Sequence, residues 1–296
     1  FTIVQRVTAT QVVSLDTTPC PPILLRENCT KGWLGYQVEF QDGSWWKLEK
    51  ALSQMEYQRT DPPFEARQVF ECVCTKDPNK CHNGVGKAIA KVKVRGKFDD
   101  RMFYFSEMER RKEDLAKKLG TKEYDKALQE YEYFSRLYHN AVKTVDTPHI
   151  FTTHEMNALK LFVEFNCQYV PHLLSSWEGP MPEGLDEQAM PGGFLKIILM
   201  NKLPGESLDY TTFWDKDKKT RKAIRRAFKV ALMEVRKCVL NLHDTTLRNL
   251  VWDEKEKKCY IVNFQQYRSL RGVPGEERAW KNSHYRFWGL AEECRE

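Results

Sequence analysis

The N-terminal part of the sequence alternates short apolar runs with turn residues, in a pattern typical of β-strands. Two of these runs flank Asp42 and Gly43. An Asp-Gly pair in that position predicts a hairpin. The runs that carry the pattern are residues 1–13, 37–40, 45–48, 69–74 and 87–94. We therefore expect a small, mostly antiparallel N-terminal sheet.

Residues 101–143 form a charged segment that favours helices, and Gly120 and Thr121 divide it into two predicted helices. Apolar and aromatic residues recur at helical spacing in its second half, at Tyr124, Leu128, Tyr131, Phe134 and Tyr138. Two interpretations remain open. The aromatic stripe packs on the body of the protein, or it forms an arm whose rings stack on a partner or on RNA.

Residues 153–174 have the apolar periodicity of a strong helix. Thr153 is its expected cap, Glu155 lies in its expected first turn, and Pro171 is its expected stop. A connection rich in glycine and proline then leads to the apolar run 194–200, which predicts a buried strand. The residues that follow, 201–205, predict a hinge between two parts of the chain.

Residues 218–242 predict a basic helix. Its expected inner face consists of the residues Ala223, Ala227, Val230, Ala231, Glu234 and Cys238. Between Asp215 and Lys237 there are ten lysines and arginines and three acids, so this segment alone exceeds the net charge of +6 of the whole chain. The repulsion among these positive charges is reduced either by solvent alone or by an anionic partner.

Composition restricts the class of protein. A chain of 296 residues with 41% hydrophobic and 30% charged residues is typical of a globular protein. The sequence has no apolar run near the roughly 20 residues that a membrane span needs, and no signal-peptide pattern, so we expect a cytoplasmic protein. The nine cysteines have no regular framework or standard zinc spacing, which favours reduced thiols and predicts no metal site.

The candidate chemistry lies in residues 242–265. Asp244 is followed five residues later by Asn249, then by a charged turn and an apolar run that ends at Asn263 and Phe264. This layout is that of a kinase catalytic loop and its metal-binding strand.

Four signals occur in an order that resembles divergent fungal members of the protein-kinase-like superfamily, over about residues 85 to 270. They are Lys91 in Ala-Ile-Ala-Lys, Glu155 in the next strong helix, the strand and hinge 198–205, and residues 248–253. The resemblance implies an α+β, two-lobed fold. Its N-terminal lobe would span 1–200, with a small antiparallel sheet, a helical insertion at 101–143 and the Glu155 helix. A truncated, mainly helical C-terminal lobe would span 201–296.

The same resemblance implies individual roles. Lys91 would be the strand lysine that pairs with Glu155, Asp244 the catalytic-loop aspartate and Asn249 the metal-binding asparagine. The sequence departs from the family at Leu242, where His is usual, and at Asn263, where an aspartate holds magnesium. Because magnesium prefers anionic oxygen, an amide at Asn263 removes a charge that metal-ATP binding needs. We expect phosphoryl transfer to be lost.

In overall pattern the chain is also similar to the fungal arginine-containing cyclodipeptide synthases, enzymes of secondary metabolism that use two aminoacyl-tRNAs to make a diketopiperazine. The shared features are a kinase-like framework, a lost phosphotransfer ligand, a short C-terminal end and a basic helix. This resemblance implies aminoacylated tRNA and its amino-acid moieties as partners, and no DNA, membrane, metal or other cofactor. Phosphates of the tRNA would contact Lys218, Lys219, Arg221, Lys222, Arg225, Arg226 and Lys229.

Under that hypothesis, Asp244 is a general base or orients the attacking amine, and Thr245 or Thr246 supplies a nearby hydroxyl. Asn249 or Asn263 donates to the developing oxyanion. Glu155 or Asp244 binds the arginine side chain. Two alternatives remain: a non-catalytic pseudokinase that binds a partner, and a divergent active kinase that uses ATP and magnesium.

Overall fold

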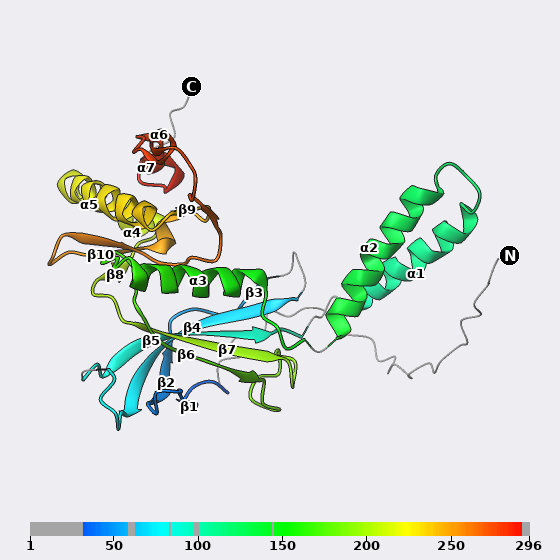
Figure 1. Ribbon diagram of the computed structural model, residues 1–296, viewed down its shortest axis with the longest axis horizontal. Coiled ribbons are helices and arrows are strands. Elements are labelled where there is room, and N and C mark those ends of the chain that lie inside the picture. Colours follow the sequence, from blue (N-terminus) through cyan, green and yellow to red (C-terminus); the bar gives the residue numbers. More distant parts are fainter. Residues whose placement is uncertain (1–31, 59–62, 83, 98–100, 144, 292–296) are drawn as a thin grey trace.

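The computed structural model describes residues 32–58, 63–82, 84–97, 101–143 and 145–291. The strand predicted at residues 1–13 lies outside them. The fold is mixed α+β, as expected, and contains a seven-stranded sheet in which every pairing is antiparallel. Its strand order is β1-β2-β4-β5-β7-β6, with β3 paired to β4 (Figure 1). The strands are β1 Gln37–Glu39, β2 Trp45–Ala51, β3 Glu56–Gln58, β4 Glu65–Lys76, β5 Lys87–Arg95, β6 Leu173–Pro180 and β7 Phe194–Asn201.

The predicted hairpin is confirmed between β1 and β2. The amide of Phe40 donates to the carbonyl oxygen of Ser44 at 2.9 Å, and Gly43 has a φ of +83°, which glycine adopts without steric cost. The predicted strands at residues 69–74, 87–94 and 194–200 are also confirmed, within β4, β5 and β7. One face of the sheet packs its apolar side chains into a core that contains Trp33, Phe70 and Leu195.

Two helices, α1 Arg101–Lys117 and α2 Tyr124–Val142, form the predicted helical insertion. They pair as a hairpin that extends away from the rest of the molecule (Figure 1). The aromatic stripe is half-buried; for example, Tyr138 lies against Phe105 of α1 with ring centroids 5.3 Å apart. The stripe therefore packs on the neighbouring helix of the hairpin.

The root of the hairpin is anchored by Arg95 at the end of β5. Its guanidinium is fully buried and donates to the carbonyl oxygen of Phe64 at 3.0 Å and to that of Asn140 in α2. The Phe64 ring packs with Leu137 and Ala141 of the same helix. A buried cation and a small apolar cluster thus join the helical hairpin to the sheet.

Helix α3, Ile150–Glu164, differs from its prediction at both ends. Its N-cap is His149, whose side chain accepts from the amide of Phe151, so Thr153 lies inside the helix and Glu155 lies in the second turn. The chain leaves the helix at Phe165, and Asn166 takes a φ of +50°, a left-handed conformation that asparagine tolerates. The predicted extension to residue 174 is therefore wrong, because the residues after Pro171 form strand β6 and pair with β7.

The C-terminal elements pack above α3, on the side opposite the large sheet (Figure 1). Helix α3 supplies Met156, Leu159 and Phe162 to a second core, which it shares with these elements. The division into lobes at residues 200 and 201 stays a prediction. The elements are β8 Glu206–Ser207, α4 Tyr210–Trp214, α5 Lys218–Lys237, β9 Leu240–Leu242, the 3-10 turn η1 Leu247–Asn249, β10 Leu250–Asp253, β11 Lys258–Ile261, β12 Tyr267–Ser269, α6 Gly275–Arg278 and α7 Ser283–Phe287.

The basic helix α5 is shorter than predicted, because it ends at Lys237 and residues 240–242 form a strand. Its buried face also differs. Large side chains fill the core, and Val230, expected inside, is 46% exposed. The buried residues are Ile224, Phe228, Ala231, Leu232, Val235 and Arg236. Among the residues that the structure describes, no helix is both long enough and apolar enough to cross a membrane.

Candidate ligand-binding site

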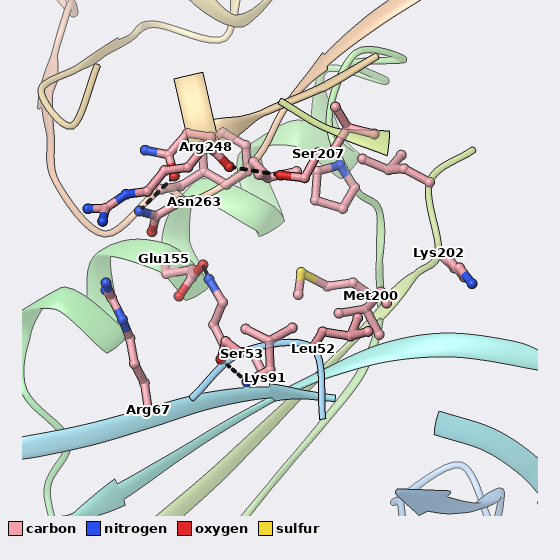
Figure 2. A pocket seen from close by; sticks show the side chains of 18 of the residues that line it. Leu52, Ser53, Arg67, Lys91, Glu155, Met200, Lys202, Ser207, Arg248 and Asn263 are labelled. Atoms are coloured by element: carbon pink, nitrogen blue, oxygen red, sulfur yellow. Dashed lines mark hydrogen bonds and ion pairs between the residues drawn. The ribbon is translucent and has the colours of Figure 1, made fainter. Parts of the chain in front are cut away.

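A cavity of about 470 Å³ lies between the large sheet and the segment that contains Asn249 and Asn263. Figure 2 shows Leu52, Arg67 and Lys91 reaching in from the sheet, Glu155 from α3, and Arg248 and Asn263 from the opposite wall. The connection after β7, with Lys202 and Gly205, closes one side. The apolar lining consists mainly of Leu52, Val69, Ile89, Met200, Val251 and Val262.

A row of buried charged side chains forms one end of the cavity. The ammonium of Lys91 forms an ion pair with Oε1 of Glu155, and the ammonium of Lys93 lies 2.9 Å from Oε2 of the same carboxylate. Lys93 also lies 3.4 Å from Oε1 of Glu65, and Gln265 donates to Glu155 Oε2 at 3.4 Å. The structure thus brings the predicted pair Lys91 and Glu155 together.

Burial by itself would raise the pKa of Glu155, but the ammonium groups of Lys91 and Lys93 outweigh it and hold that pKa below its usual value. The Glu155 side chain is therefore a carboxylate at neutral pH, shared by two cations. Such a group is expensive to bury unless each charge is matched. The order Lys91, Glu155, Lys93, Glu65 places each charge beside an opposite one and so provides that match.

Asp244, Asn249 and Asn263 also come together. Nδ2 of Asn263 lies 2.8 Å from Oδ2 of Asp244 and 3.4 Å from Oδ1 of Asn249. Nδ2 of Asn249 donates to the carbonyl oxygen of Asp244 at 2.8 Å. Asn263 has a φ of +71°, and its Oδ1 is buried without a hydrogen-bond partner among the described residues.

This arrangement does not fit a divalent cation. A carboxylate can only accept hydrogen bonds, so Asp244 requires the amide of Asn263 to present its NH₂ group, which cannot be a metal ligand. Within the described part of the chain, no group of three or more His, Cys, Asp or Glu residues is placed to hold a metal ion.

The other predicted catalytic residues lie beside the cavity. Asp244 is not among the residues that line it but contacts the lining residue Asn263, and Thr245 does not line it either. The amide of Thr245 donates to the carbonyl oxygen of His243 at 3.0 Å, as a turn residue does. Thr246 precedes η1 and receives a hydrogen bond from the amide of Asn249.

The seven cations predicted to contact tRNA all lie on α5, and none of them lines the cavity. Three pack against the protein. Arg221 and Arg225 lie over the ring of Trp214 at 5.0 and 5.9 Å, and Lys229 lies over Trp280 at 5.3 Å. The exposed members are Lys218, Lys219, Lys222, Arg226 and Lys229.

Sequence reasoning missed Lys93, Arg67 and Arg248 as site residues. A signal for Lys93 was available, because Lys91 and Lys93 are two residues apart on a strand and therefore share a face. Arg67 pairs with Lys93 across β4 and β5, a register that the sequence does not specify. Arg248 enters the cavity only because η1 turns beside it.

Comparison with known proteins gives a distant structural likeness. No protein-family model matches the chain, and a search of curated proteins finds no significant match. Among solved structures, the chain is similar to the kinase PK-1 of the Cydia pomonella granulovirus, with a TM-score of 0.38 and 12% sequence identity. The match covers 76% of this chain and 52% of that chain, so this chain spans about half the length of the viral kinase.

Proposed function

We propose that this chain is a kinase-like protein that binds a nucleoside-type ligand in its cavity and does not transfer phosphoryl groups through magnesium. The observation that carries the proposal is the 2.8 Å contact between Asn263 Nδ2 and Asp244 Oδ2, next to the intact pair of Lys91 and Glu155. The pair that orients a bound ligand is retained, while the group that would hold the metal has become a hydrogen-bond donor.

The size and lining of the cavity support ligand binding. Its volume of about 470 Å³ falls in the range of small-molecule sites, roughly 300–1,000 Å³. Val69 and Ile89 line it from the sheet and Val251 from β10, so apolar groups face a ligand from two sides. The connection at Lys202 and Leu203 borders the same space and offers backbone groups for hydrogen bonds. A planar heteroaromatic ring matches this combination.

The charges in the cavity argue against magnesium-dependent catalysis. Phosphoryl transfer depends on metal ions that neutralise the charge on the transferred group. Glu155 is already shared by two lysines, and Asp244 accepts from Asn263. Carboxylate oxygens that are committed in this way cannot also coordinate a cation without breaking those contacts.

Adenosine is a suitable probe of the ring site. We expect a near-saturating concentration, about 100 times Kd, to stabilise the protein by about 2.7 kcal/mol and to raise Tm by roughly 5 °C. Ile89→Phe, which fills the cavity, should abolish the shift, and Val163→Phe, on the exposed side of α3, should retain it. An adenosine shift that persists in Ile89→Phe, or no shift in the unaltered protein, contradicts the proposal.

Loss of phosphoryl transfer is tested separately. With ATP and magnesium, we expect no phosphate release or autophosphorylation above the background of the Lys91→Met variant. Turnover in the unaltered protein that disappears in Lys91→Met would instead establish the active-kinase alternative.

A second candidate is tRNA-dependent formation of an arginine-containing cyclic dipeptide. The observation that favours it is the exposed cationic face of α5, formed by Lys218, Lys219, Lys222 and Arg226. Incubation with arginyl-tRNA and each other aminoacyl-tRNA, followed by mass spectrometry, tests it. The absence of any cyclic dipeptide would reject this candidate.

RNA binding by α5 has its own test. The triple variant Lys219→Gln, Lys222→Gln, Arg226→Gln should weaken tRNA binding and flatten its salt dependence. Replacement of the exposed Lys117, Lys122 and Lys126 in the helical hairpin by Gln is the matched control. Equal effects of the two triple variants would contradict a tRNA surface on α5.

A further inference from the structure

Cations dominate the charged lining of the cavity. Arg67 and Lys91 enter from the sheet and Arg248 from the opposite wall, while Lys202, directly after β7, points away from the cavity and pairs with Glu71 (Figure 2). The carboxylates in the lining are Glu56 and Glu155. Glu56 pairs with Arg67 and Glu155 with Lys91, so the lining cation whose charge is least compensated is Arg248, and it favours an anionic ligand at its end of the cavity.

Each lining carboxylate is satisfied by a cation of the protein. Oε2 of Glu56 accepts from Nε of Arg67 at 2.9 Å, and Glu155 is shared between Lys91 and Lys93. The carboxylate of Asp244 accepts from Asn263 and lies 3.9 Å from the guanidinium of Arg248. A divalent cation would have to displace these partners and would meet further repulsion from the neighbouring lysines and arginines.

Lys93 allows Lys91 to turn toward a ligand. If Lys91 were the sole partner of Glu155, its movement would leave a buried carboxylate uncompensated, which is costly. The ammonium of Lys93, fully buried at 2.9 Å from Glu155 Oε2, keeps that carboxylate paired. The Lys91 ammonium is therefore available to an anion in the cavity.

Arg248 is free to move as well. Its side chain is 64% exposed, and its contact with Asp244 is 3.9 Å long, so little interaction energy holds it in place. A guanidinium presents several N–H donors in one plane and can bind two phosphate oxygens at once. Arg248 adjoins Asn249, beside the position where a metal ion would sit in a kinase-like site.

We propose that the cavity binds a nucleotide through its polyphosphate group without a divalent cation, with Lys91 and Arg248 supplying the positive charge. This inference rests on the proposed function, because it assigns the phosphate end of the same ligand site. It explains why an amide at Asn263 is compatible with a charged ligand: protein cations replace the charge of the metal ion.

The test compares ATP, adenosine and inorganic tripolyphosphate by isothermal titration calorimetry in EDTA, at low and at physiological salt. We expect ATP to bind at least tenfold more tightly than adenosine in EDTA, and magnesium not to improve its affinity. Arg248→Gln should weaken ATP binding about tenfold and leave adenosine binding within twofold. Arg248→Lys should recover part of the loss, and the exposed Arg136→Gln should have no effect. Circular dichroism confirms that each variant folds.

The outcomes separate this inference from the proposed function. If adenosine binds and ATP in EDTA binds no more tightly, the polyphosphate inference is wrong and the ring site stands. If ATP binds tightly only with magnesium, the cation-free site is likewise rejected. If neither adenosine nor ATP binds, both proposals fail. Tripolyphosphate binding that Arg248→Gln does not change would place the anion elsewhere and also overturn the inference.

Discussion

Nδ2 of Asn263 donates to Oδ2 of Asp244 at 2.8 Å, and this contact ties the loop around Asp244 to the segment that follows β11. The NH₂ group of Asn263 thereby occupies Oδ2 of the Asp244 carboxylate. At the same time its own Oδ1 stays buried without a partner among the described residues.

Asn263→Asp should convert the loop toward a metal site. Without a divalent cation, the new carboxylate would face Asp244 and lose the hydrogen bond, so we expect the free energy of unfolding to fall by about 1–3 kcal/mol. Magnesium or manganese should restore part of that loss in the variant and leave the unaltered protein unchanged. Thermal unfolding with and without the cation measures both effects.

The matched control is Asn157→Asp, because Asn157 is exposed on α3. It should be nearly neutral and insensitive to the cation. Equal stabilisation of the unaltered protein and of Asn263→Asp by magnesium would show that the amide does not determine metal binding.

Glu155→Gln should strongly destabilise the protein. The side chain is 1% exposed in total and is shared by two ammonium groups, so the substitution leaves Lys91 buried without its counter-charge and leaves Lys93 with Glu65 alone. Breaking a buried ion pair from one side costs about 3–5 kcal/mol. Urea unfolding measures the loss, and Glu164→Gln, at the exposed end of the same helix, should stay within about 0.5 kcal/mol.

The same carboxylate predicts a dependence of stability on pH. Against the burial that would raise it, Lys91 and Lys93 hold the folded-state pKa of Glu155 below the ordinary 4.5. The unfolded chain therefore binds the proton more readily than the folded one. The stability that Glu155 contributes is present above about pH 4.5 and is lost as the pH falls below that value. Between pH 6 and pH 3, the difference in unfolding free energy between the unaltered protein and Glu155→Gln should narrow, and a constant difference would contradict this linkage.

Gly205→Ala should distort the connection that borders the cavity. Gly205 has a φ of +100°, and a Cβ there would lie 2.2 Å from the carbonyl oxygen of Trp252 in β10. Gly120, between α1 and α2, has a φ of +80° with open space around its Cβ position. Both alanine variants carry the cost of positive φ, about 1–2 kcal/mol, but Gly205→Ala adds a backbone clash. Chemical denaturation should therefore show a larger loss of unfolding free energy for Gly205→Ala than for Gly120→Ala. Equal losses would mean that the connection can move away from Trp252 without an energetic cost.

The local sequence was sufficient for elements whose signals are local. The hairpin around Asp42 and Gly43 follows from turn chemistry, and the division of the helical insertion at Gly120 follows from an interruption of helical periodicity. The C-terminal end of α3 could not be predicted from the local sequence, because the apolar residues after Pro171 satisfy helical and strand patterns alike. Pairing with β7 decided that they form β6. Strand pairing is a long-range interaction that periodicity does not encode.

By itself the sequence determined the antiparallel α+β architecture and the spacing of Asp244, Asn249 and Asn263. It also placed Lys91 and Glu155 on the strand and helix that bring them together. Only the tertiary structure decided that Lys93 shares Glu155, that Arg67 and Arg248 enter the same cavity, and that Arg221 and Arg225 of α5 pack on Trp214. These relations join residues far apart in the chain. Their energies depend on distance and burial in three dimensions, which the order of residues does not fix.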